Sequence, residues 1–123
     1  MMQPNFEHGQ FVEVEPGVEL YYEYFGKAKG DPLLFVPGIT LSTGVFEKQV
    51  AHFAKKHKVA VMDPRSQGRS SKVHYGNTYE QHGVDLKKVI EHAGLKNVTL
   101  IGWSSGAADV WSYVDQFGTG NLK

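Results

Sequence analysis

A serine hydroxyl between two glycines is the group in this sequence that is best suited to chemistry. Ser104 is the centre of the segment 102–106, which has the pattern Gly-x-Ser-x-Gly. A serine on a sharp turn holds its Oγ clear of the backbone, where it can attack an electrophilic carbon. The glycines allow the two arms of such a turn to approach closely, because they carry no Cβ. The pattern also occurs by chance in unrelated proteins, so the segments around it must show whether this serine is a nucleophile.

The segments on both sides of this motif predict a strand followed by a helix. Residues 98–101 are short, apolar and β-branched, as in a buried parallel strand. After the motif, apolar residues recur at helical spacing as far as Phe117, and Gly118 is expected to end the helix. The helix N-terminus directs amide dipoles toward a developing oxyanion. We therefore expect Ser104 to be a nucleophile in a strained turn.

The rest of the chain predicts strands and helices in alternation after an opening hairpin. Strands are expected at 11–15, 19–25, 33–36 and 58–62, and helices at 43–57 and 78–93. Thr78 begins a capping box, and Gly94 is the expected end of that helix. This order predicts an α/β fold with a mostly parallel sheet of about five strands, an N-terminal antiparallel hairpin and flanking helices. Residues 1–123 are expected to lie within a single domain.

Together with two loops, the motif makes the chain resemble the N-terminal half of an α/β-hydrolase, in the serine esterase-like branch. The first loop is Pro37–Thr40 and the second is Asp63–Ser70, and each follows an expected strand. The family usually has His-Gly in the first loop and Asp-x-Arg-Gly-x-Gly-x-Ser in the second, so Pro37 and Ser66 depart from its pattern. Serine as the nucleophile argues against the dehalogenase and epoxide hydrolase branches. The resemblance implies an incomplete α/β-hydrolase core.

The resemblance also implies the other residues of the site. The backbone N–H groups of Ile39 and Ser105 are expected to form an oxyanion hole. Trp103 and Thr40 are expected to line the substrate pocket, although Trp103 could equally pack in the core and Thr40 could simply form a turn. The expected ligand is a small-molecule acyl substrate. Neither a metal site nor an organic cofactor is implied.

The base and the acid of a serine hydrolase have no matching residues after Phe117 in this sequence. In the family that this chain resembles, the acid and then the histidine follow the nucleophile in the chain. All six histidines of this sequence precede Ser104. His74 is the one that could approach the motif. The others on predicted helices are expected on solvated faces, namely His52, His57, His82 and His92.

Two aspartates are given structural roles by their positions. Asp63 is expected to hold a turn together with Arg65 rather than to act as the catalytic acid. Asp109 is expected in the first turn of the helix after the motif, where the helix dipole favours a carboxylate.

Composition narrows the class of protein further. There are 13 basic and 13 acidic residues and no cysteine. Charge balance gives no support to nucleic-acid binding, and the absence of cysteine excludes disulfides and thiolate metal sites. The polar residues 1–10 are not expected to form a signal peptide, and no apolar run in the sequence is long enough to span a membrane. A cytoplasmic protein is therefore expected.

Three hypotheses about function remain open. The first is a serine hydrolase that acts on a carboxylic ester or a related acyl substrate. The second is an inert truncated fragment, or a half that pairs with a complementary chain or with itself at the exposed strand edge 98–101. The third is a non-catalytic small-molecule-binding module on the same fold. Because the triad acid and histidine are missing, the isolated 123 residues are expected to be inactive. No Gly-x-Gly-x-x-Gly follows a strand, which argues against a dinucleotide-binding domain.

Overall fold

The computed structural model describes residues 9–26 and 30–123 and contains one five-stranded sheet. Its strands are β1 (Gly9–Glu15), β2 (Val18–Phe25), β3 (Leu33–Val36), β4 (Val59–Met62) and β5 (Thr99–Gly102). The spatial order is β1-β2-β4-β3-β5. β1, β2 and β4 pair antiparallel, whereas β3 pairs parallel with both β4 and β5. The expected α/β fold with an N-terminal hairpin is therefore confirmed. Residues 1–10, which are expected not to form a signal peptide, lie largely outside the described residues.

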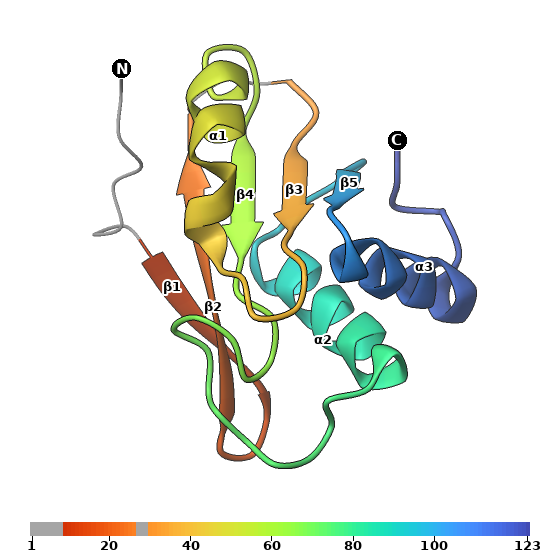
Figure 1. Ribbon diagram of the computed structural model, residues 1–123. Coiled ribbons are helices and arrows are strands. Elements are labelled where there is room, and N and C mark those ends of the chain that lie inside the picture. Colours follow the sequence, from red (N-terminus) through yellow and green to blue (C-terminus); the bar gives the residue numbers. More distant parts are fainter. Residues whose placement is uncertain (1–8, 27–29) are drawn as a thin grey trace.

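Helices cover both faces of this sheet (Figure 1). They are α1 (Glu47–Phe53), α2 (Tyr79–His92) and α3 (Ser105–Phe117). α1 lies on one face, and α2 and α3 lie side by side on the other (Figure 1). Within the described ranges, no helix is long and apolar enough to cross a membrane.

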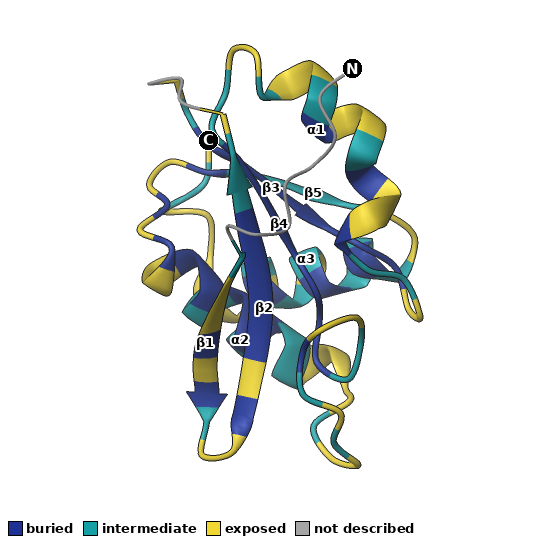
Figure 2. Ribbon diagram, turned by 90° about the vertical axis from the view of Figure 1, so that its left-hand side faces the viewer, coloured by how far each residue is buried: buried dark blue, intermediate teal, exposed yellow. Residues whose placement is uncertain are grey.

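The strands are buried by alternation of their side chains between these two faces. In β3, Leu34 and Val36 belong to the larger apolar cluster under α2 and α3, whereas Leu33 and Phe35 pack with α1. All four residues are buried (Figure 2). A strand with both faces covered has no polar face, which explains the uninterrupted apolar run in its sequence.

The caps of α2 agree with the sequence, but the helix expected at 43–57 is shorter. Thr78 Oγ1 accepts a hydrogen bond from the Gln81 N–H at 3.2 Å, as an N-cap does, whereas the Gln81 side chain donates to Asp85 Oδ1 at 2.8 Å. By contrast, residues 43–46 form a 3₁₀ turn and α1 ends at Phe53. The Thr43 N–H begins this turn, where it has no acceptor within the turn, and donates to Asp63 Oδ1 at 2.8 Å. Beyond Ala54 the lysine-rich sequence offers no continuing apolar stripe to hold another helical turn against the sheet.

Three loops meet at one edge of the sheet, and this meeting creates the candidate site. The carboxyl ends of β3 and β5 are paired at Val36 and Gly102, and β4 ends beside them. The chain leaves β3 toward α1 on one face and leaves β5 toward α3 on the other (Figure 1). In α/β sheets this kind of switch point leaves a crevice in which ligands bind.

Candidate active site

Ser104 lies on the sharp turn between β5 and α3. Its backbone has φ 56° and ψ −125°, a strained conformation for a residue with a Cβ. The residue is exposed, and although it is the N-cap of α3, its side chain makes no capping hydrogen bond. The hydroxyl oxygen of an N-cap serine ordinarily accepts a hydrogen bond from one of the first helical N–H groups. The Oγ of Ser104 is therefore available for other chemistry.

Glycines make this turn sterically possible. A Cβ at Gly106 would lie 2.2 Å from the carbonyl oxygen of Val36, and a Cβ at Gly102 would lie 2.5 Å from that of Gly106. Neither distance is tolerable, so both positions need glycine for close approach of strand and helix. A Cβ at Gly38 would lie 3.1 Å from Ser104 Cβ, which brings the loop after β3 against the nucleophile.

The loop after β3 is held in place by a side chain from the loop after β4. Gln67 Nε2 donates to the carbonyl oxygens of Gly38, at 2.9 Å, and Leu41, at 2.7 Å. The Leu41 N–H closes the turn on Gly38 O at 3.1 Å, and Thr40 takes a positive φ of 67° inside it. Gln67 was not among the predicted site residues, although it belongs to the second of the two loops on which the resemblance rests.

The two amides expected in the oxyanion hole lie on facing segments. The Ile39 N–H donates to Ser105 Oγ at 2.5 Å, so the loop after β3 contacts the start of α3 directly. Gly106 and Ala107 donate their N–H groups to Trp103 O and Ser104 O. In the described part of the chain, no hydrogen bond holds the Ser105 N–H.

The two residues expected to line the substrate pocket lie in different cavities. Thr40 borders a cavity of about 380 Å³ that Ile39 and Ser105 also line. Trp103 borders a second cavity, of about 340 Å³, with Leu41 and other residues around α1. Trp103 is 56% exposed, which excludes plain core packing as its role.

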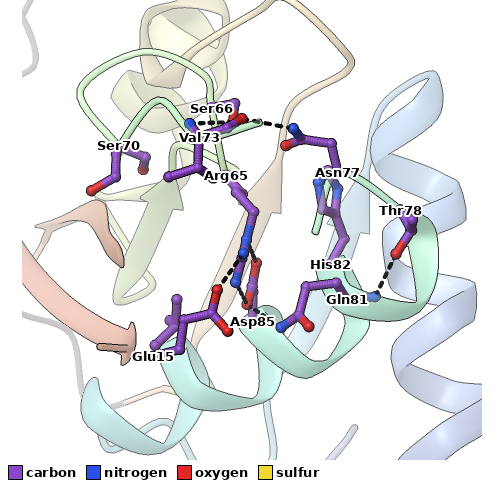
Figure 3. Close-up of polar contacts among 12 residues, drawn as sticks. Glu15, Arg65, Ser66, Ser70, Val73, Asn77, Thr78, Gln81, His82 and Asp85 are labelled. Carbon is purple, nitrogen blue, oxygen red and sulfur yellow. Dashed lines mark hydrogen bonds and ion pairs between the residues drawn. The ribbon is translucent and has the colours of Figure 1, made fainter. Parts of the chain in front are cut away.

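The second loop is anchored by its charged side chains, as expected for Asp63. The Asp63 carboxylate accepts from the N–H groups of Thr43 and Arg69, both at 2.8 Å. Arg65 does not share this turn, because its guanidinium forms a fork with Asp85 at 3.0 Å and contacts Glu15 at 2.7 Å (Figure 3). Burial alone would lower the pKa of Arg65, but these two carboxylates raise it. Burial raises the pKa of Asp63.

A histidine–aspartate pair in this region was not anticipated. His82 Nδ1 lies 2.9 Å from Asp109 Oδ1, and the His82 side chain is only 14% exposed. The expectation of a solvated face was therefore wrong for His82. Both residues line the larger cavity, and His82 Nε2 is buried without a partner among the described residues. His82 precedes Leu86 by four residues and Val89 by seven, so the apolar stripe of α2 already placed it on the inner face.

The expectation for Asp109 also needs correction. α3 begins at Ser105, so Asp109 lies beyond the first turn, and its pairing with His82 holds it more directly than the helix dipole does. His74 is exposed and borders neither cavity. In the described residues, no group of three or more potential ligands could hold a metal ion.

Comparisons with known proteins agree with this geometry. Residues 31–121 match the sequence model of the alpha/beta hydrolase fold. The chain is 31% identical over 113 residues to a non-heme haloperoxidase of Rhodococcus erythropolis, which covers 91% of this chain and 40% of the relative. It is 28% identical over 108 residues to a bifunctional esterase/perhydrolase of Acinetobacter calcoaceticus, covering 87% and 39%.

Solved structures give the same result. A bromoperoxidase from Bacillus anthracis superimposes with a TM-score of 0.87 at 30% identity, covering 94% of this chain and 42% of that one. An esterase from Exiguobacterium antarcticum superimposes with a TM-score of 0.87 at 28% identity, covering 93% and 42%. The chain thus spans about two fifths of the length of these relatives.

Proposed function

The chain belongs to the α/β hydrolase fold family, and we propose that it contributes the nucleophile and the oxyanion hole of a serine hydrolase that acts on a carboxylic ester or a related acyl substrate. The observation that carries the proposal is the conformation of Ser104. Its strained turn, its exposure and its uncapped hydroxyl together suit an attacking group. Relatives named as an esterase and an esterase/perhydrolase support the substrate class.

The proposed reaction is acyl transfer to Ser104. Its Oγ attacks the ester carbonyl carbon while a base accepts the hydroxyl proton, and the carbonyl π electrons move onto oxygen. The N–H groups of Ile39 and Ser105 stabilise that oxyanion. Collapse of the intermediate expels the alcohol, which takes a proton from the protonated base. Water then hydrolyses the acyl-enzyme by the same steps and releases the acid and free Ser104.

The base and its orienting acid are proposed to come from outside these 123 residues. No histidine follows Ser104 in the chain, and the order nucleophile, acid, histidine is the one that the fold uses. His82 is bound to Asp109, but its Nε2 is buried and contacts neither serine of the motif. A complementary chain could supply the missing groups, with the open edge of β5 as its site of attachment.

Covalent labelling with a fluorophosphonate tests the proposal directly. We expect label on the peptide that contains Ser104, in protein isolated from the native source, and its loss in Ser104→Ala. Ser112→Ala removes a serine hydroxyl from the same helix, where among the described residues it accepts a hydrogen bond from Gln116, and should leave labelling unchanged. Label on the Ser104 peptide of a longer species would place the remaining groups in that same chain. Absence of label from a folded protein would instead favour the non-catalytic binding module.

A further inference from the structure

The side chain of Ser105 accepts a hydrogen bond from one of the two amides that the proposed function assigns to the oxyanion. The Ile39 N–H, one of the two proposed oxyanion donors, donates to Ser105 Oγ at 2.5 Å. An oxyanion must lie within hydrogen-bond distance of this same N–H and of the Ser105 backbone N–H. A hydroxyl oxygen already on the first of these donors competes with a substrate oxygen for it.

We propose that the Ser105 hydroxyl is a built-in plug of the oxyanion hole, which must rotate away before the hole can receive the carbonyl oxygen of an ester. The proposal rests on the proposed function, and assigns to the Ser105 side chain a role separate from that of its backbone N–H. The contact lowers the reactivity of Ser104 in the resting protein, because binding of substrate oxygen must first break a hydrogen bond.

The surroundings of this contact make Ser105 the part that moves. On one side, Gln67 and the Leu41 N–H hold the loop of Ile39 in place. On the other side, the N–H groups of Gly106 and Ala107 fix the first turn of α3. The Ser105 hydroxyl itself is attached through one rotatable bond, about which it can move between staggered positions. Rotation about that bond frees the Ile39 amide without moving either backbone.

The neighbouring cavity can receive the displaced hydroxyl. Ser105 lines the cavity of about 380 Å³ together with Asp109. Asp109 follows Ser105 by four residues on the same helix, so the two side chains are neighbours on one face. Asp109 uses Oδ1 for His82, and its Oδ2 can accept the Ser105 hydroxyl.

Removal of the hydroxyl tests the plug. The variants are made in the protein as its source produces it, and fluorophosphonate labelling of Ser104 is followed with time. Ser105→Ala should raise the second-order labelling rate about two- to tenfold, which corresponds to the loss of one competing hydrogen bond. Ser105→Thr keeps a hydroxyl and should stay nearer to the unmodified protein, and Ser112→Ala controls for loss of a serine elsewhere in α3.

A second readout separates the plug from the proposed function. Hydrogen exchange of the Ile39 amide should become faster in Ser105→Ala, because its acceptor is gone, and should not change in Ser112→Ala. Labelling that is equal or slower in Ser105→Ala, while the unmodified protein reacts, overturns the plug and leaves the proposed function standing. Unchanged exchange at Ile39 overturns the contact itself. No label on any variant counts against the proposed function, and exchange then decides alone whether Ser105 holds the Ile39 amide.

Discussion

Glu23 brings a carboxyl group into the interior of the sheet at the centre of β2. Its side chain is fully buried, and Oε1 accepts a hydrogen bond from the Tyr21 hydroxyl. Oε2 has no partner among the described residues, and Arg69 Nη1 lies 3.9 Å from Oε1. Burial raises the pKa of Glu23, and the nearby Asp63 adds to the shift, while Tyr21 and Arg69 oppose it. Burial likewise raises the pKa of Tyr21 to about 12.

This raised pKa makes stability depend on pH in a definite direction. The folded protein holds the Glu23 proton more tightly than the unfolded chain, whose glutamates have a pKa of about 4.3. The stabilisation is therefore complete below that value and is lost as pH rises through the pKa of the folded state. Glu23→Gln is always neutral, so its free energy of unfolding relative to the unmodified protein should improve as pH rises from about 4 to about 8. Each unit of pKa elevation corresponds to about 1.4 kcal/mol.

Urea unfolding of both proteins across this range measures the difference. Glu13→Gln, an exposed position on the neighbouring strand β1, controls for the loss of one negative charge. A constant difference between Glu23→Gln and the unmodified protein at all pH values would show that Glu23 keeps the same protonation state in the folded and unfolded chain.

The junction of β3, β5 and α3 depends on the absence of a Cβ at position 106. A Cβ at Gly106 would meet the carbonyl oxygens of Val36 at 2.2 Å and Pro37 at 2.7 Å. Backbone atoms cannot move aside as a flexible side chain does, so Gly106→Ala should destabilise the fold by about 1–3 kcal/mol and slow the labelling of Ser104. Gly120 has open space around its Cβ position, and Gly120→Ala should change stability by less than about 0.5 kcal/mol. Equal urea midpoints for the two variants would contradict this account of the junction.

Periodicity and capping were sufficient to predict most strands and helices of the fold. The hairpin, β3 and α2 follow from alternation, an apolar run and a capping box, each of which is a local signal. The strained Ser104 turn was predicted from the Gly-x-Ser-x-Gly motif between a strand and a helix, and the φ of 56° at Ser104 confirms it. The helix over 43–57 was overextended because residues 43–46 form a 3₁₀ turn and the lysine-rich segment after Ala54 has no apolar stripe to hold a further helical turn against the sheet.

Long-range side-chain partners were the part that sequence could not supply. His82 has the polarity of a surface residue, and only the packing of α2 on α3 brings it to Asp109. Arg65, Asp85 and Glu15 form ion pairs although they lie on three separate segments of the chain (Figure 3). The contact of the Ile39 amide with Ser105 Oγ depends on a rotamer, about which the Gly-x-Ser-x-Gly pattern carries no information.

At the scale of the whole molecule, the sheet has one open edge beside the candidate site. In the described residues β5 pairs with β3 alone along 99–102. Val98 was expected to belong to this exposed edge, but it is buried and forms a parallel bridge with Leu122. The N–H groups of Thr99 and Trp103 donate to the β3 segment, so by alternation those of Leu100 and Gly102 point away from it. These outward groups are a template for a further strand.

We therefore expect the 123-residue chain to associate with itself through β5. Size-exclusion chromatography should give an apparent mass above the 13.7 kDa of one chain, decreasing on dilution. Because the formal net charge is zero and the edge offers backbone hydrogen bonds, added salt should not dissociate the complex. Trp111 on α3 is 71% exposed, so an apolar contact at α3 is the alternative interface for self-association. Trp111→Ser removes that contact and leaves the β5 edge unchanged. Association that survives this substitution supports the β5 edge, association that disappears moves the interface to α3, and a single 13.7 kDa species at every concentration would show that the edge does not pair.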